Sequence, residues 1–274
     1  MTLFHVDEGK CERCGICAAV CPMGIIAWEN RETMPAPVSG AEKLCINCGH
    51  CLAVCPHGAL ELATMPLEQC PKIGLSRQPD FAEFSSLVKS RRSTREYKDQ
   101  EVDKRLIAEL IDTARYAPTG KNTQMLNWLV IQERERLAPL IDHCLDWMRD
   151  MVAKDHPMAR DFRMEGIVRA HDSGQDIILH GAPALVVISG PRAYPGTPVD
   201  AVIALATFEL AAASRGLGTC WAGFFHIACN MWPPLLAALD LAEGHIPGFS
   251  MMLGHPKYRH KRVPLRNAPT ITWR

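Results

Sequence analysis

The chain has 274 residues, with 30 basic and 30 acidic side chains and no formal net charge. This balance argues against a nucleic-acid partner, and 47% hydrophobic with 22% charged residues argues against a disordered chain. The length predicts about two domains.

The first ten residues carry acidic side chains and no apolar run, so no signal peptide is expected. The longest apolar stretch, residues 199–213, is interrupted by Asp200 and Glu209 and is shorter than the ~20 residues that cross a bilayer. We therefore expect a cytoplasmic protein without a membrane partner. Glu209 is expected to be a hydrogen-bonded acid with a structural role, because an isolated buried carboxylate is costly.

Eight of the twelve cysteines form two copies of the pattern CxxCxxCxxxCP, 34 residues apart. In this pattern three cysteines of one loop bind one iron–sulfur cluster, and the fourth, which precedes a proline, binds the other. The pattern predicts two [4Fe–4S] clusters with crossed ligation. One set is Cys11, Cys14, Cys17 and Cys55, and the other is Cys45, Cys48, Cys51 and Cys21.

A disulfide framework and a pair of zinc sites are the alternatives. The first is typical of small secreted scaffolds, and zinc motifs lack the third and fourth cysteine with the trailing proline. The copies share a glycine after the second cysteine, so they form an internal repeat, and this resembles the bacterial ferredoxins with two [4Fe–4S] clusters. Cys70 has no partner cysteines at ligand spacing and is expected to be a packing residue.

Short β-like runs at residues 3–6, 25–28 and 59–62 flank the cysteine loops and predict two small βαβ-like halves. A module of this size depends on its metal for much of its folding free energy. We place this ferredoxin-like domain at residues 1–66 and a proline-containing linker at 67–80, followed by a second domain at 81–274.

The second domain alternates between helical and strand periodicity, which predicts an α+β protein. Helices are expected at residues 81–91, 103–117, 133–153, 165–180, 199–216 and 232–241. Strands are expected at residues 128–132, 183–189, 219–222 and 246–253.

Four ordered motifs lie in this second domain. An RRSTREY run (residues 91–97) follows the first helix, and YAPTGKNTQ (116–124) follows the second. A GLGTCWAG run (216–223) follows the apolar helix, and LGHP (253–256) precedes HKRVP (260–264). The guanidinium groups and hydroxyl of the first run suit a phosphate-bearing ligand.

The order of these motifs resembles the nitroreductase family of FMN-dependent flavoproteins. The resemblance implies a three-layer α/β domain with a mixed, mainly antiparallel sheet, an intertwined homodimer and FMN at the subunit interface. Many relatives carry Pro and Trp where this chain has Met125 and Leu126, so the substrate preference stays open. The segment from about Asp142 to Gly174, where a substrate lid is expected, has no readable motif.

The resemblance also implies the FMN-binding residues. Arg91, Ser93 and Arg262 would hold the phosphate and ribityl chain, with Arg92 over the ring region and His260 or Lys261 assisting at the phosphate. Arg95 and Asn122 would reach the pyrimidine edge, with Gln124 in the same motif. A backbone amide near Ala222 or Gly223 would face flavin N5. No catalytic residue is identified.

The combined motifs predict an oxidoreductase that passes electrons between two [4Fe–4S] clusters and FMN. Its acceptor would be a nitroaromatic, quinone-like or activated alkene compound, with dehalogenation or flavin fragmentation also open. A ferredoxin, a flavodoxin and NAD(P)H are the candidate donors. The alternative is a non-catalytic electron-transfer or redox-sensing protein whose acceptor is another protein.

Overall fold

The computed structural model describes residues 3–74 and 78–274 and divides the chain into two compact units. Unit 1 comprises residues 1–78 with 120–123, and unit 2 comprises residues 79–119 and 124–274. The division after residue 78 falls inside the predicted linker 67–80, of which residues 75–77 lie outside the described part of the chain.

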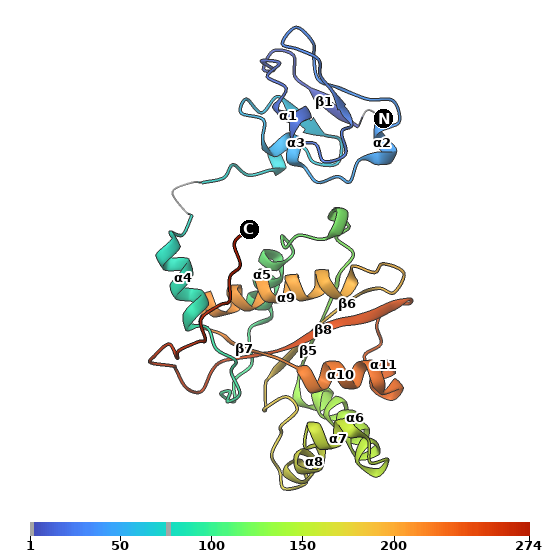
Figure 1. Ribbon diagram of the computed structural model, residues 1–274, viewed down its shortest axis with the longest axis vertical. Coiled ribbons are helices and arrows are strands. Elements are labelled where there is room, and N and C mark those ends of the chain that lie inside the picture. Colours follow the sequence, from blue (N-terminus) through green and yellow to red (C-terminus); the bar gives the residue numbers. More distant parts are fainter. Residues whose placement is uncertain (1–2, 75–77) are drawn as a thin grey trace. The chain divides into compact units, whose positions relative to one another are not determined.

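Unit 1 is built from short helices and two small antiparallel strand pairs (Figure 1). Its elements are β1 (Phe4–Val6), α1 (Ile16–Ala19), β2 (Ile26–Ala27), β3 (Ala36–Pro37), α2 (Ala41–Leu44), α3 (His50–Ala53), β4 (Leu60–Leu62) and the 3-10 turn η1 (Leu67–Gln69). Strand β1 pairs with β4, and β2 pairs with β3. The prediction of βαβ-like halves is wrong, because both pairs are antiparallel and β1 pairs with the strand that follows the second cysteine loop.

Unit 2 is a four-stranded sheet with helices on both faces (Figure 1). Its helices are α4 (Phe81–Ser90), α5 (Lys104–Ala114), α6 (Arg134–Ala153), α7 (Pro157–Asp161), α8 (Met164–Asp172), α9 (Thr197–Ser214), α10 (Gly223–Met231) and α11 (Pro233–Ala238), with the 3-10 turn at Gly120–Asn122 assigned to unit 1. Its strands are β5 (Asn127–Gln132), β6 (Ala184–Pro191), β7 (Gly218–Trp221) and β8 (His245–Gly254), in the order β5-β6-β8-β7. All three neighbouring pairs are antiparallel, and an isolated bridge between Ser93 and Thr219 is parallel. The predicted α+β class is confirmed.

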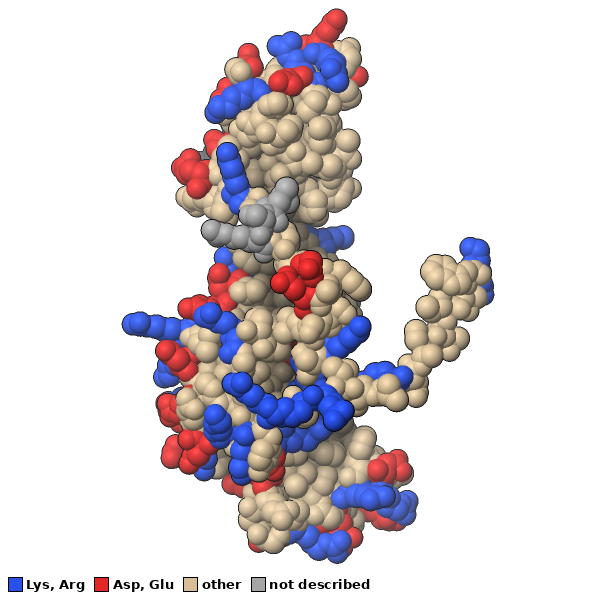
Figure 2. Space-filling view, turned by 90° about the vertical axis from the view of Figure 1, so that its left-hand side faces the viewer, with Lys and Arg blue, Asp and Glu red and all other residues tan. Residues whose placement is uncertain are grey.

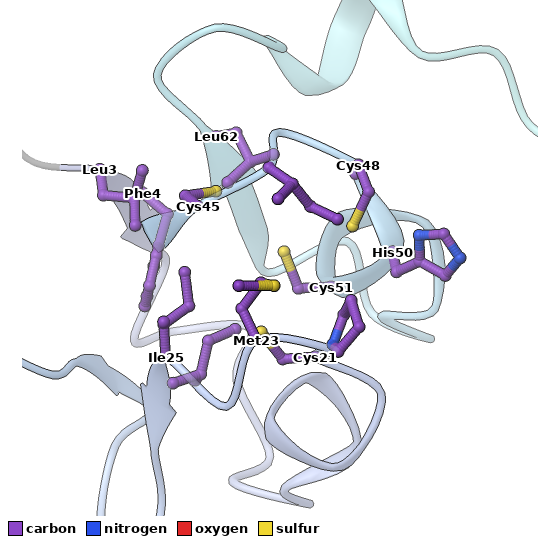
Figure 3. A pocket seen from close by; sticks show the side chains of 14 residues that line it. Leu3, Phe4, Cys21, Met23, Ile25, Cys45, Cys48, His50, Cys51 and Leu62 are labelled. Carbon is purple, nitrogen blue, oxygen red and sulfur yellow. The ribbon is translucent and has the colours of Figure 1, made fainter. Parts of the chain in front are cut away.

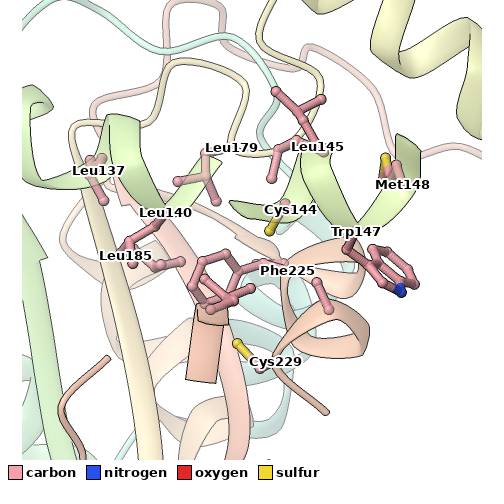
Figure 4. Close-up of a cluster of buried hydrophobic side chains, with 14 of the residues drawn as sticks. Leu137, Leu140, Cys144, Leu145, Trp147, Met148, Leu179, Leu185, Phe225 and Cys229 are labelled. Atoms are coloured by element: carbon pink, nitrogen blue, oxygen red, sulfur yellow. The ribbon is translucent and has the colours of Figure 1, made fainter. Parts of the chain in front are cut away.

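Two hydrophobic cores lie on opposite faces of this sheet. On one face, α6, α8, α10 and α11 bury Trp147, Met148, Phe225 and their neighbours (Figure 4). On the other face, α5 and α9 bury Leu205 and Phe208 against β6 and β8. Strand β6 is buried along almost its whole length, as expected of a central strand covered on both faces.

Helix α9 is apolar on almost every side. Among the described residues it is the one helix long and apolar enough to cross a membrane by length and composition alone. Its Asp200 and Glu209 are buried, and the helix packs against α5, β6, β7 and β8. The helix ends before Gly216, whose φ of 73° is the left-handed conformation that terminates helices.

Three helices of unit 2, α7, α8 and α10, differ from the prediction. The helix expected at 165–180 ends at Asp172, because Gly174 takes φ of 92° and the Asp176 carboxylate accepts the N–H groups of Ile178 and Leu179. Helices α7 and α10 were not predicted, because five and nine residues give too short a window for helical periodicity to be recognised in the sequence.

Candidate cofactor sites

Four cysteines surround a cavity in unit 1, and their sulfur atoms point into it (Figure 3). They are Cys21, Cys45, Cys48 and Cys51, the second predicted ligand set. The cavity contains about 390 Å³ of space free of protein atoms, part of it open to solvent, and is otherwise lined by apolar side chains such as Phe4 and Ile25. We call it the Cys45 cavity.

The other four cysteines of the repeat line a second cavity of similar size. Cys11, Cys14, Cys17 and Cys55 line this cavity, which contains about 370 Å³ of space free of protein atoms, part of it open to solvent, and which we call the Cys11 cavity. Each cavity thus takes three cysteines from one loop and the fourth from the other loop. This is the crossed grouping that the spacing predicted.

The chemistry of both cavities fits a large, positively charged inorganic group bound by thiolates. All eight cysteines are free thiols, so the disulfide alternative does not describe the structure. A backbone N–H points to one sulfur in each cavity, from Asn47 to Cys45 Sγ at 3.4 Å and from Ala59 to Cys55 Sγ at 3.2 Å. Such bonds to cluster-bound sulfur are one of the means by which proteins tune iron–sulfur clusters.

Burial opposes ionisation of these thiols when they are unligated. It raises the pKa of Cys51 to about 11 and also raises the pKa of Cys17. A bound metal deprotonates such a thiol outright. Occupation of each cavity by a metal group would therefore release protons and stabilise unit 1.

A third cavity, in unit 2, is open to solvent, contains about 1,010 Å³ of space free of protein atoms, and has several basic lining residues. It lies between the ends of α4 and α9, β7 and the start of the C-terminal segment, where Figure 2 shows Lys and Arg side chains gathered. We call it the Arg91 cavity. Its basic lining residues are Arg91, Arg92, Arg259 and His260.

The segment that carries Arg91 and Arg92 is fixed at both ends. Helix α4 begins with a capping box in which Asp80 and Glu83 exchange hydrogen bonds, and Arg91 is its C-terminal cap. Three residues later, the Thr94 N–H donates to Thr219 O at 2.8 Å. This contact requires Gly218, since a Cβ there would lie 2.8 Å from Thr94 Cβ.

Arg91 forms an ion pair inside unit 2. Its Nη1 donates to Glu209 Oε1 at 2.9 Å, and the Glu209 side chain is only 9% exposed. The expectation that Glu209 is a hydrogen-bonded buried acid is confirmed.

The structure brings some of the predicted FMN-binding residues together. Arg91, Arg92 and His260 line the Arg91 cavity, whereas Ser93, which is bridged to Thr219, is not among the lining residues. Arg95, Lys261 and Arg262 are exposed.

Ala222 and Gly223 lie at the start of α10. The Ala222 N–H donates to Ser250 O at 3.0 Å, so this amide is already used within the fold. Gly223 is the first residue of the helix, where N–H groups have no acceptor within the helix. Of the two amides expected near flavin N5, the geometry favours that of Gly223.

Neither Asn122 nor Gln124 is among the residues that line the Arg91 cavity. Asn122 belongs to the segment grouped with unit 1, where its Nδ2 donates to Ile46 O and Asn47 O at 3.1 and 2.9 Å. Gln124 is exposed beside a separate cavity of about 640 Å³ that includes Thr119 and Trp128. In this single chain, the structure does not bring either residue to Arg91.

Several residues that line the Arg91 cavity were not predicted from the sequence. Arg259 and Tyr258 directly precede the HKRVP motif, and their position beside it was an available signal. Thr94 and Thr219 also line the cavity, but only the strand contact between their segments reveals this.

Comparison with known proteins supports both units. A family model described as the nitroreductase family matches residues 88–255, and one described as a 4Fe-4S dicluster domain matches residues 10–60. Both resemblances expected from the motifs are confirmed.

Two relatives carry reductase names. The FMN reductase [NAD(P)H] of Bacillus subtilis is 30% identical over 190 residues, which cover 63% of this chain and 66% of the relative. The 4-nitrobenzoate reductase of Pseudomonas putida is 28% identical over 163 residues, which cover 50% of this chain and 71% of the relative. The chain thus spans slightly less than two thirds of the first relative.

Solved structures share the fold of unit 2. A nitroreductase with bound FMN from Bacteroides fragilis superposes with a TM-score of 0.59 at 23% identity and covers 70% of this chain and 98% of its own. One from Desulfitobacterium hafniense, also with bound FMN, gives a TM-score of 0.57 at 24% identity over 69% of this chain and 97% of its own.

Proposed function

Because the chain belongs to the nitroreductase family, we propose that unit 2 binds FMN and is an oxidoreductase that reduces a small organic acceptor. The observation that carries this proposal is the Arg91 cavity, in which Arg91, Arg92, Arg259 and His260 converge. Guanidinium groups bind phosphate through paired hydrogen bonds, so these basic lining residues suit the FMN phosphate.

We further propose that each cysteine cavity holds one [4Fe–4S] cluster. The support is the division of the eight cysteines into two sets of four, each around a cavity of nearly equal size. When bound, the clusters supply single electrons, and FMN accepts or donates electrons singly or in pairs.

The chain's own residues bind and orient the flavin. Arg91, Ser93 and Arg262 would hold the phosphate and ribityl chain, with His260 or Lys261 assisting at the phosphate and Arg92 over the ring region. Arg95 would stabilise negative charge at the pyrimidine edge, where a fixed cation acts without reorganisation. The Gly223 N–H would face N5.

A homodimer accounts for exposed apolar surface on two helices. On α9, Val199 is 61% exposed and Val202 is 40% exposed, and on α4, Phe81 is 84% exposed. Apolar side chains that follow helical spacing on an exposed face mark an interaction surface. A second copy would also bring a second set of the residues Asn122 and Gln124, which are not among the lining residues of the Arg91 cavity.

The acceptor class that we propose is nitroaromatic, quinone-like or activated alkene. The names of the Bacillus and Pseudomonas relatives support NAD(P)H as donor and a nitro compound as acceptor. A ferredoxin or flavodoxin as donor would instead deliver electrons singly.

The test is cofactor analysis followed by turnover. Protein purified without oxygen should contain FMN together with equal amounts of iron and sulfide, and zinc should be absent. The reduced protein should then consume a nitroaromatic compound over many cycles. Reduced protein that transfers electrons only to another protein would instead identify a non-catalytic carrier.

A further inference from the structure

Glu209 is a buried acid in an otherwise apolar helix. The residue is 7% exposed, and its neighbours on α9 include Leu205, Phe208 and Ala212 of the sheet-facing core. A buried carboxylate without partners is costly, so its surroundings must compensate for lost hydration. Two side chains from other elements do so.

Arg91 and Thr219 both donate to the same oxygen of Glu209. Arg91 Nη1 lies 2.9 Å from Oε1, and Thr219 Oγ1 lies 3.4 Å from it. Arg91 follows α4 and Thr219 lies in β7, so the carboxylate joins α9 to both elements, and its two donors line the Arg91 cavity.

The contact uses one edge of the guanidinium group. Arginine carries five N–H donors in a rigid plane. The bond from Nη1 to Glu209 uses one of these donors and holds the group at the cavity lining, so the remaining donors stay available to an anion there. The Arg91 side chain is 24% exposed, so solvent screens this ion pair only in part.

We propose that Glu209 is a positioning residue that orients Arg91 for the FMN phosphate, with Thr219 fixing the carboxylate. This inference rests on the proposed binding of FMN in the Arg91 cavity. Glu209 also places a negative charge near a site for a dianion, which by itself weakens phosphate binding. The two effects therefore have opposite signs, and substitution separates them.

The experiment measures the dissociation constants of FMN and of riboflavin, which lacks the phosphate, with full-length protein from which the bound flavin has been removed. The ratio of the two constants is the FMN-over-riboflavin preference. Glu209→Ala should lower the FMN-over-riboflavin preference by roughly tenfold or more, the value of a lost charge-assisted hydrogen bond. Glu209→Gln keeps an acceptor for Arg91 and should retain most of the preference. If the carboxylate acted only through its charge, both variants would increase the preference.

Three further variants complete the test. Asp200→Asn, a change at another buried acid of α9, should leave the preference unchanged even if it lowers stability. If Glu209→Ala does not fold, Thr219→Val should lower the preference by a smaller factor. Arg91→Ala should abolish much of the preference.

The outcomes distinguish the inference from the proposed function. If Arg91→Ala loses the preference for FMN and Glu209→Ala keeps it, the positioning role is wrong and the proposed FMN site stands. Where Glu209→Ala does not fold, an unchanged preference in Thr219→Val leads to the same conclusion. A preference unchanged in Arg91→Ala would show that the phosphate does not bind at Arg91, and the proposed FMN site would be wrong.

Discussion

The two copies of the cysteine loop provide a matched pair of substitutions, Gly15→Ala and Gly49→Ala. Both glycines follow the second cysteine of their loop and line a cysteine cavity. Their φ values are 75° and 72°, so an L-residue is strained equally at both, by about 1–2 kcal/mol. The surroundings of the two positions differ.

At Gly15 an added Cβ would lie 2.6 Å from Cδ2 and Cε3 of Trp28. The indole cannot move freely, since its Nε1 donates to Arg13 O at 3.1 Å. At Gly49 the nearest atom is Met65 Sδ at 3.1 Å, the end of a flexible side chain. Overpacking against the indole adds about 1–3 kcal/mol, so Gly15→Ala should destabilise unit 1 by ~2–5 kcal/mol and Gly49→Ala by ~1–2 kcal/mol.

The assay is anaerobic urea unfolding of the metal-loaded protein, followed by loss of the visible absorbance of the clusters. Gly15→Ala should lose this absorbance at a clearly lower urea concentration than Gly49→Ala, and both should lose it before wild type. Equal midpoints for the two variants would refute the reasoning from Trp28. A midpoint for Gly15→Ala at the wild-type value would also refute the strain argument.

Gly218→Ala should push Thr94 away from β7, lower the free energy of unfolding of unit 2 by about 1–3 kcal/mol in chemical denaturation, and weaken FMN binding. An unchanged free energy of unfolding would contradict the close approach of Gly218 and Thr94. Cys55→Ser should lower the iron content of the purified protein by about half, because it removes a ligand of one cluster. Cys70→Ser should leave the iron content unchanged, because Cys70 packs against the core of unit 1 outside both cavities. A lower iron content in Cys70→Ser would show that Cys70 is a ligand. Chelation of the iron should unfold unit 1 and leave the circular dichroism of unit 2 largely intact; loss of both units together would contradict independent folding.

The cysteine cavities were predictable because cluster ligation is encoded locally. Three ligands come from one short loop, and the proline after Cys21 and after Cys55 turns the fourth cysteine away. The pairing of β1 with β4 was not predictable in the same way. Strands of two or three residues carry too little periodicity to select a partner, so the packing of the unit decides it.

The Arg91 cavity was predictable only in part. The order of the motifs identified Arg91, Arg92 and His260, which do converge. The ion pair of Arg91 with Glu209 joins residues 118 positions apart, and no local pattern reports such a contact. Asn122 and Gln124 were assigned to the FMN site from the family resemblance alone. That resemblance implies a site shared between two subunits, so it does not predict which residues line the cavity of a single chain.

The most direct test of the account is anaerobic stopped-flow spectroscopy of the full-length protein mixed with NADPH, recorded across the flavin and cluster bands. We expect both bands to bleach within one reaction and to recover when a nitroaromatic acceptor is added. Bleaching confined to one cofactor, with the other unchanged after prolonged incubation, would contradict electron exchange between the clusters and the flavin.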